Sequence, residues 1–257
     1  MSIYQHFRPE EKEFIDSVLQ WKHFVEDTYS PKLTDFLDPR EQEIVKQIIG
    51  NNGDVNFKLF GGFQHAERKR ALLYPEYFQC ENDDFHICLF EIKYPHKFVT
   101  IEHPQVLGSL MSLGLRRGKF GDILFHEDSI QFLATGDIDQ YIVAQLDSIG
   151  RASVSLERLP LEKAIEPQED WVELSVTASS LRLDTVMSAV YNISRQKSQA
   201  LIQHGHAKVN WATIENPAFE VRESDMISVR GYGRMKIMSL DGKTKKDKWK
   251  ITAGKQK

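Results

Sequence analysis

The sequence predicts an α+β fold with three parts: a helical N-terminal segment, a central α+β domain, and a C-terminal module of helices and strands. Two patterns predict it. Apolar residues recur at helical spacing in residues 1–50 and 183–190, and they alternate with polar residues in several stretches between 55 and 158 and beyond 207. At 257 residues the chain also exceeds one comfortable hydrophobic core, so two or three domains are expected.

Residues 1–74 form the first predicted domain, which we expect to be mostly helical. An apolar helical face runs from Phe14 to Val25, and Pro31 divides the region. The Asp38-Pro39-Arg40-Glu41 segment is a typical start for a helix that ends at Gly50. No chemistry is assigned to this part.

The stretch from residue 55 to 73 predicts a strand at 55–60, which could also join the central domain, a turn at Gly61-Gly62, and a short helix at 67–73. The glycines precede three basic residues, and two interpretations are open: a phosphate-binding loop, or a turn before a solvated helix. The stretch lacks the Gly-x4-Gly-Lys-Ser/Thr pattern of a phosphate loop.

Residues 75–165 form the second predicted domain. Two helices against a mostly antiparallel sheet predict a ferredoxin-like, or RRM-like, sandwich. The expected strands are 85–94, 98–102, 122–125, 129–134 and 152–158, and the expected helices are 104–115 and 137–149. Residues 166–180 follow as a predicted linker, with Pro167 among acidic residues.

Residues 181–257 form the third predicted domain. Its first helix carries an apolar stripe from Leu183 to Val190, and one of the two serines at 179–180 can cap it. A second helix follows Ser194 as N-cap and stops at Gly205. Strands are expected after this glycine.

Arg195 and Lys197 lie in the first turn of that second helix. Cations there are slightly unfavourable against the helix dipole, so the fold alone does not require them. A phosphate at the same place is favoured by the free N–H groups, by the dipole and by both side chains. The pair therefore indicates an anionic ligand.

The strands beyond residue 207 carry polar and basic side chains at alternate positions, which places them on one face of each strand. These positions are Lys208 and Asn210, Ser228 and Arg230, Arg234 and Lys236, and Lys248 and Lys250. From Ser179 onward the chain has 15 Lys and Arg against 7 Asp and Glu, a net of +8, whereas the preceding residues have 18 against 30, a net of −12. A basic module on an acidic body indicates an electrostatic partner for the module. A solvated tail is the alternative for the seven cations from Lys243 onward.

The set Arg182-Leu-Asp, Ser194-Arg with a downstream Leu-Ile and Gly, Lys208-Val-Asn, and Asp225-x-Ile-x-Val resembles the S4-like, or alpha-L, RNA-binding domain over residues 181–237. Trp211 departs from it, because many members have glycine after the Val-Asn pair. The resemblance implies RNA contacts at Arg182, Ser194, Arg195, Lys197, Gln199, Lys208 and Asn210, to which the alternation argument adds Arg230, Arg234 and Lys236.

The segment Leu113-Gly-x-x-Arg-x-x-Phe-Gly-Asp-Ile ahead of this domain is similar to the YlmH family of bacterial RNA-binding proteins and extends the resemblance to nearly the whole chain. That resemblance implies binding to structured RNA, either rRNA of the large ribosomal subunit or tRNA, including ribosomes blocked by peptidyl-tRNA. In the same segment, Arg116, Arg117 and Lys119 form either a second RNA contact or part of a surface loop.

Several other classes of function lack the residues they need. The chain shows no secretory signal and no apolar run near the ~18–20 residues of a membrane span, so a cytoplasmic protein without membrane contact is expected. Cys80 and Cys88 fit no zinc spacing, and the His204-Gly205-His206 pair supplies two metal ligands at most. We expect no metal, no cofactor and no catalytic residue, a structural role for Asp184, a monomer, and no binding to DNA.

Two hypotheses of function follow. The first is a non-catalytic RNA-binding factor that acts on ribosomes in quality control or rescue; replacing Arg195 and Lys197 by glutamate should then abolish RNA binding while the fold survives. The second is an RNA-modifying enzyme, similar to a pseudouridine synthase, that uses the S4-like domain to bind its substrate. A protein-only interaction module is a third alternative.

Overall fold

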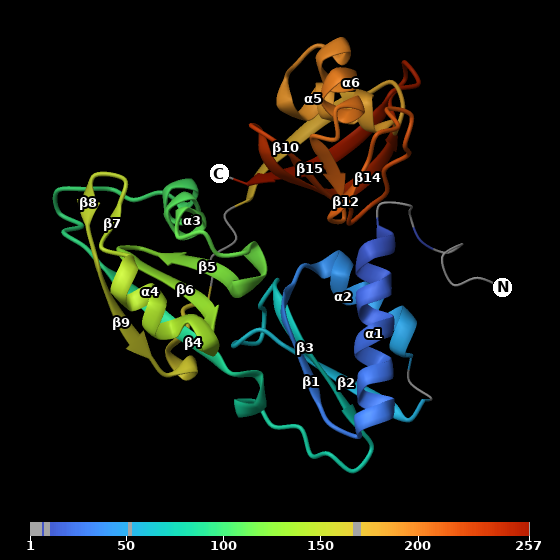
Figure 1. Cartoon of the computed structure of the whole chain (residues 1–257). Coiled ribbons are helices and arrows are strands. Elements are labelled where there is room, and N and C mark those ends of the chain that lie inside the picture. Colours follow the sequence, from blue (N-terminus) through green and yellow to red (C-terminus); the bar gives the residue numbers. More distant parts are fainter. Residues whose placement is uncertain (1–6, 8–10, 51–52, 167–170, 257) are drawn as a thin grey trace. The chain divides into compact units, whose positions relative to one another are not determined.

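A computed structural model describes Phe7 and residues 11–50, 53–166 and 171–256 of the chain (Figure 1). The chain divides into two compact units, residues 1–168 and residues 169–257. The predicted α+β class is confirmed, with helices in the N-terminal part and two further helices in the C-terminal unit. Within the described segments, no helix combines the length and apolarity that a membrane crossing requires.

The N-terminal part of the first unit packs two helices on a three-stranded antiparallel sheet of order β1-β3-β2 (Figure 1). A capping box, in which Asp38 accepts from the Glu41 amide and Glu41 from the Asp38 amide, starts the second helix as predicted. Ile15, Val18 and Val25 of the first helix lie in one core with Leu73 of the central strand. The elements are α1 (Lys12–Thr28), β1 (Lys32–Leu37), α2 (Pro39–Ile49), β2 (Val55–Phe60) and β3 (Lys69–Pro75).

The predicted short helix at 67–73 is wrong, because residues 69–75 form β3, the middle strand of this sheet. Its residues 70–73 are all buried, and a run that is buried at every position has no period that separates a strand from a buried helix. β1 is a further strand in a region where only helices were expected. β2 pairs with β3 and not with the central sheet.

The central part is a four-stranded antiparallel sheet of order β5-β6-β4-β9 with α3 and α4 on one face (Figure 1). This order, with the sequence βαββαβ, confirms the ferredoxin-like or RRM-like prediction. The elements are β4 (Ile87–Lys93), α3 (His103–Ser112), β5 (Phe120–His126), β6 (Ser129–Thr135), α4 (Asp139–Gln145), β9 (Ser155–Leu159) and the small hairpin of β7 (Ser148–Ile149) and β8 (Ala152–Ser153). The strand predicted at 98–102 is wrong, since Phe98 ends a turn and is 87% exposed, and residues 99–102 are irregular.

The apolar part of the second face of the four-stranded sheet is also covered, whereas Lys93 and Glu157 on the same face are exposed. Leu89, Leu124 and Leu133 point to this side and are at most 1% exposed, because Phe36 of β1 and the side chains of Phe63 and Leu161 pack on them. Gly62 packs on the same surface. Its φ is +98°, and a Cβ at this position would lie only 2.2 Å from Leu133 Cδ2, so only glycine fits here. The Gly61-Gly62 turn is therefore a close-packing loop without a following helix, and it helps to cover the apolar part of this face.

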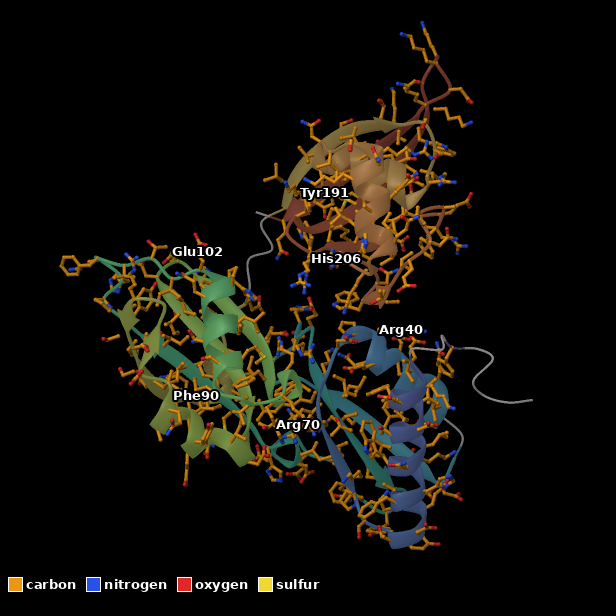
Figure 2. All side chains as sticks on the ribbon, turned by 45° about the horizontal axis from the view of Figure 1, so that its top comes forward. Arg40, Arg70, Phe90, Glu102, Tyr191 and His206 are labelled. Atoms are coloured by element: carbon orange, nitrogen blue, oxygen red, sulfur yellow. The ribbon has the colours of Figure 1, made fainter. Side chains whose placement is uncertain are left out.

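Polar contacts also join the two parts of the first unit. The buried Arg70 donates from Nε to the Thr34 carbonyl (2.7 Å) and from Nη1 to the Phe85 carbonyl (2.7 Å), so it lies between the two sheets (Figure 2). Asp122 of β5 accepts from the backbone amides of Glu67 (2.6 Å) and Arg68 (3.0 Å). Apolar burial and these contacts together make the first 166 residues one structural unit.

The C-terminal unit is a six-stranded antiparallel sheet, order β10-β15-β14-β13-β11-β12, with two helices packed on one face. Residues 171–178, which the sequence analysis assigned to the linker, form β10 and pair with β15 along its whole length. The N-cap of the first helix is Arg182 and not Ser179 or Ser180. Residues 167–170 lie outside the described segments. The elements are β10 (Trp171–Ala178), α5 (Leu183–Tyr191), α6 (Arg195–Gln203), β11 (Ala207–Val209), β12 (Ala212–Thr213), β13 (Met226–Val229), β14 (Gly233–Lys243) and β15 (Trp249–Gln256).

The Phe36 ring joins the two sheets of the first unit, and its removal tests this joint. We expect Phe36→Ala to lower the free energy of unfolding of this unit by about 3–5 kcal/mol, since it leaves a cavity against Leu89 and Leu133. The control is Phe98→Ala, which removes an exposed ring and should change stability by less than about 0.5 kcal/mol. Urea unfolding, followed by hydrogen exchange at the amides of β4 and β6, measures both; equal effects would contradict the assigned packing.

Candidate nucleic-acid interface

Asp184, at the start of α5, organises the helix side of the C-terminal unit. Its carboxylate is fully buried and accepts hydrogen bonds from three side chains of the implied RNA surface and from a neighbouring threonine. The donors are Arg182 Nε (3.1 Å) and Nη2 (3.1 Å), Thr185 Oγ1 (3.1 Å), Arg195 Nε (3.0 Å) and Gln199 Nε2 (2.8 Å). The predicted structural role of Asp184 thus has a specific form: it joins α5 to α6.

The electrostatics of this junction keep Asp184 ionised. Burial by itself raises the pKa of a carboxyl group, but hydrogen bonds from Arg182, Gln199, Arg195 and Thr185 outweigh it and hold the pKa of Asp184 well below its usual range. Two guanidinium groups therefore meet one carboxylate, and the junction keeps a net positive charge.

Arg195 is held at one edge and open at the other. Its Nε donates to Asp184, whereas neither Nη atom donates a hydrogen bond within the described residues, and its side chain is 52% exposed. A guanidinium fixed through Nε presents its two Nη groups in the geometry that matches a phosphate. Asp184 therefore orients Arg195 without occupying the edge that a phosphate would use.

Ser194 and Lys197 complete the start of α6. Ser194 is the predicted N-cap, and its Oγ accepts from the Lys197 amide (3.2 Å), so its hydroxyl serves the helix. The Lys197 ammonium lies over the ring of Tyr232, 5.4 Å from the centroid. We call Arg182, Ser194, Arg195, Lys197 and Gln199 the helix cluster.

A second group of predicted residues lies on the sheet. Lys208, Ser228 and Arg234 are direct cross-strand neighbours on β11, β13 and β14, and the next residues along these strands, Val209, Ile227 and Met235, point into the core. Lys236 follows two residues after Arg234 on the same face. We call Lys208, Arg230, Arg234 and Lys236 the sheet cluster.

The sheet cluster lines a shallow groove. Lys208, Arg230 and Arg234 surround a hollow of about 350 Å³. His206, which follows α6 and is labelled in Figure 2, also lines it. The Arg230 amide donates to the His206 carbonyl (2.9 Å), which fixes the end of α6 against the strand. We call this hollow the basic groove.

The helix and sheet clusters arise on opposite sides of the C-terminal sheet, because α5 and α6 cover its core face and the sheet cluster lies on the other. They meet at the turn of residues 230–234. Tyr232 in this turn contacts Lys197 and also the ring of Tyr191, with 5.5 Å between the centroids, and the Tyr191 hydroxyl donates to the Gly233 carbonyl (3.1 Å). This turn gives the two clusters a shared edge.

Asn210 has a structural role that the resemblance did not indicate. Its Nδ2 donates to Asp225 (2.8 Å) and its Oδ1 accepts from the Met226 amide (2.9 Å). Asn210 (φ +48°) and Trp211 (φ +64°) are the two central residues of the β11–β12 turn. Both take the left-handed conformation of a type I′ turn, which glycine and asparagine tolerate and tryptophan does not favour.

The possible second RNA contact divides into separate roles. Arg117 donates from Nη1 to the carbonyls of Phe120 (2.6 Å) and Gly121 (3.2 Å). Lys119 Nζ bonds to Asp35 (2.9 Å) and Asp137 (2.7 Å), so its charge is balanced inside the unit. Arg116 is exposed. Two of the three cations therefore hold the loop in place.

The sequence analysis did not identify the residues that pack against the predicted RNA-contact residues at the shared edge. Tyr191, Tyr232 and Lys255, whose ammonium lies 5.6 Å from the Tyr191 ring centroid, belong to the shared edge. The Gly231-Tyr232-Gly233 segment was the available signal, since a tyrosine between two glycines in a basic stretch indicates that its ring contacts another residue or a ligand. Among the residues that the structure describes, no three His, Cys, Asp or Glu side chains gather in a way that could hold a metal ion.

Sequence profiles of known families match three consecutive parts of the chain. The profile described as "YlmH, N-terminal" matches residues 10–78, and "Putative RNA-binding domain in YlmH" matches residues 80–163. The S4 domain profile matches residues 181–227.

Known proteins give the same division. The chain is 48% identical over 255 residues to the ribosome-associated protein quality control protein P2 of Bacillus subtilis, covering 99% of each chain. It is 32% identical over 78 residues to the small ribosomal subunit protein uS4 of Fervidobacterium nodosum, which is 30% of this chain and 37% of that protein. The solved structure of the cell division protein ylmH from Streptococcus pneumoniae is similar with a TM-score of 0.55 and 38% identity, covering 64% of this chain and 100% of that one.

Because the pKa of Asp184 is lowered in the folded protein, we expect the stability of the C-terminal unit to decrease in acid. Because the folded carboxyl has a lower pKa than an unfolded aspartate, its stabilising effect is complete above about pH 4 and decreases as the pH falls below that value. Asp184→Asn should lower the free energy of unfolding at neutral pH by about 2–4 kcal/mol and flatten this acid dependence. Denaturant unfolding between about pH 7 and pH 2.5 measures both; Asp247→Asn, at an 83% exposed side chain, is the control that should change neither.

The Trp211 backbone predicts a stabilising substitution. Trp211→Gly should raise the stability of the C-terminal unit by about 1 kcal/mol, because glycine adopts a positive φ without the Cβ clash. Trp211→Ala keeps the Cβ and should show no such gain. Thermal unfolding compares the variants, and a loss of stability in Trp211→Gly would mean that the indole contributes more than the turn costs.

Proposed function

This chain belongs to the YlmH family, with a C-terminal S4 domain, and from this premise we propose that it is a non-catalytic RNA-binding protein that acts on ribosomes in the cytoplasm. Its RNA is rRNA or tRNA, and its target is the large subunit that carries peptidyl-tRNA, in quality control or rescue. The B. subtilis relative that matches the whole chain is named for ribosome-associated quality control, which supports this proposal.

The observation that carries the proposal is the pre-oriented Arg195. A charged side chain that is already fixed loses little conformational freedom when a phosphate binds. Arg182 also binds Asp184, and Lys197, two residues after Arg195, lies at the shared edge. Three cations at the adjacent starts of α5 and α6 suit the phosphates of a folded RNA, which proteins recognise mainly by shape.

The sheet cluster supplies the second contact area. Lys208 and Arg230 line the basic groove and form no ion pair with any carboxylate of the described residues. A backbone strand of RNA that passes the turn of residues 230–234 would meet both clusters. The proposed contacts are therefore Arg182, Arg195, Lys197, Lys208, Arg230, Arg234 and Lys236, with Ser194, Gln199 and Asn210 placing them. Arg116, the exposed cation among Arg116, Arg117 and Lys119, is the proposed contact in the first unit.

The groove provides a direct test of RNA binding. Lys208→Glu plus Arg230→Glu should weaken binding to ribosomal RNA by at least about tenfold near physiological salt and reduce the salt slope of the affinity by about 2. The matched control is Lys245→Glu plus Lys246→Glu, the same change of charge in the exposed β14–β15 turn. Filter binding over a salt series measures both; equal losses would mean that general charge, and not the groove, binds RNA.

Arg195→Glu plus Lys197→Glu is a less specific test than the sequence suggested. The new glutamate at 195 would stand beside the buried Asp184 and remove one of its donors, so the fold is expected to weaken as well. Lys197→Glu alone leaves the Asp184 junction intact and separates the two effects.

The absence of catalysis is tested on the RNA itself. If the protein only binds, rRNA and tRNA from a deletion strain should carry every modification found in the parent strain. Mass spectrometry of nuclease digests measures this, and a missing pseudouridine that returns on complementation would establish the modifying enzyme instead.

A further inference from the structure

A second hollow lies in the first unit, at the junction of β3 with the start of β4, the end of β6 and β9. Its volume is about 570 Å³, within the range of about 300–1,000 Å³ that is usual for small-molecule sites. The residues that matter for its chemistry are Arg70, Asp83, Asp137 and Arg158. We call it the junction pocket.

Arg70 enters this pocket as a fixed donor. It is only 6% exposed, and its Nε and Nη1 donate to the carbonyls of Thr34, Phe85 and His86 at 2.7, 2.7 and 3.1 Å. Its Nη2 donates no hydrogen bond within the described residues. The buried side-chain atoms without a partner there are Arg68 Nε and Thr135 Oγ1, so Arg70 Nη2 keeps accessible surface. One N–H group of an immobile guanidinium is therefore left for a ligand.

The other polar groups of the pocket make it a mixed site and not an anion site. Arg158 donates from Nη1 to Asp139 (2.9 Å) and keeps a 62% exposed side chain, and Asp137 accepts from Lys119 (2.7 Å). The lining holds two arginines and two aspartates, so its formal charge is zero. A free phosphate gains little from such a lining, whereas a neutral ring with both acceptors and donors on its edge can satisfy both kinds of group.

The fold also explains why such a ring would be bound here. RRM domains stack bases on the open face of their sheet. In this protein Phe36, Phe63 and Leu161 cover the apolar part of that face, and the part that stays exposed carries the charged side chains of Lys93 and Glu157 instead of stacking aromatics. The residues matched by the RNA-binding-domain profile, 80–163, nevertheless supply every lining residue of the junction pocket except Arg70. A base bound by this domain would therefore need a site beside the sheet.

We propose that the junction pocket binds one guanine base, extruded from the RNA that the protein contacts. Guanine places its O6 and N7 acceptors on one edge, for Arg70 Nη2 and Arg158, and its N1–H and N2–H₂ donors beside them, for the carboxylates of Asp83 or Asp137. Recognition of an extruded base through its hydrogen-bonding edge follows known chemistry. The inference rests on the proposed function only for the source of the base.

The test uses the four nucleoside 5′-monophosphates, which share their phosphate and differ in the base. Each is titrated into the full chain, and amide chemical shifts are followed by NMR. Guanosine monophosphate should shift the amides of Ile87, Cys88 and Gly136 and bind at least about tenfold more tightly than the other three, since one charged hydrogen bond changes affinity about tenfold.

Variants locate the site. Arg158→Ala and Asp83→Asn should each weaken guanosine monophosphate binding about tenfold, whereas Arg151→Ala, at an exposed arginine of the β7–β8 turn, should not. Arg70 is left intact because its bonds to three carbonyls hold the unit together. Equal binding of all four nucleotides, shifts confined to residues 205–234, or equal losses in Arg151→Ala would each overturn the proposal.

Filter binding of RNA separates this inference from the proposed function. If RNA binds through the basic groove but guanosine monophosphate shows no preference, the guanine pocket is rejected alone. If the preference is present but RNA does not bind, the proposed function fails and the pocket serves a free nucleotide.

Discussion

The buried carboxylate of Asp184 is the constraint on which the candidate interface depends. A fully buried charge is tolerated only when it is surrounded by donors, and here three of the four donor side chains belong to the helix cluster. The fold and the interface thus share one group of atoms. Arg182 and Arg195 would repel each other without the carboxylate, and the carboxylate would be unstable without them.

In the first unit, packing instead covers a surface that related folds use to bind RNA. RRM domains bind RNA on an open sheet face, but here Phe36, Phe63 and Leu161 cover the apolar part of that face. The N-terminal part is therefore more than an addition to the central domain: it completes the core and moves any ligand to the rim. Fold likeness to RRM domains alone therefore does not show which surface of the central domain binds a ligand.

The C-terminal module could be predicted well from the sequence, because its signals are local. The Leu183–Val190 stripe, the Ser194 cap and the alternation around Lys208 and Arg234 each follow from short-range rules, and the helices and strands are where these rules place them. The β3 helix prediction failed because burial on both sides of a central strand removes its period. The hydrogen bonds to Asp184 could not be predicted from the sequence either. Their donors, Arg182, Arg195 and Gln199, come from the starts of two helices, and only the folded structure brings them to one carboxylate.

The pairing of β10 with β15 means that the chain enters and leaves the C-terminal unit side by side. The first strand of the unit, β10, therefore covers the edge of its last strand, β15. A fragment that begins at Leu181, where the S4 profile begins, would leave eight residues of β15 as a bare edge, open to pairing between copies. A fragment that keeps the whole sheet of this S4-containing unit therefore begins at Trp171, ten residues before the segment that the S4 profile matches.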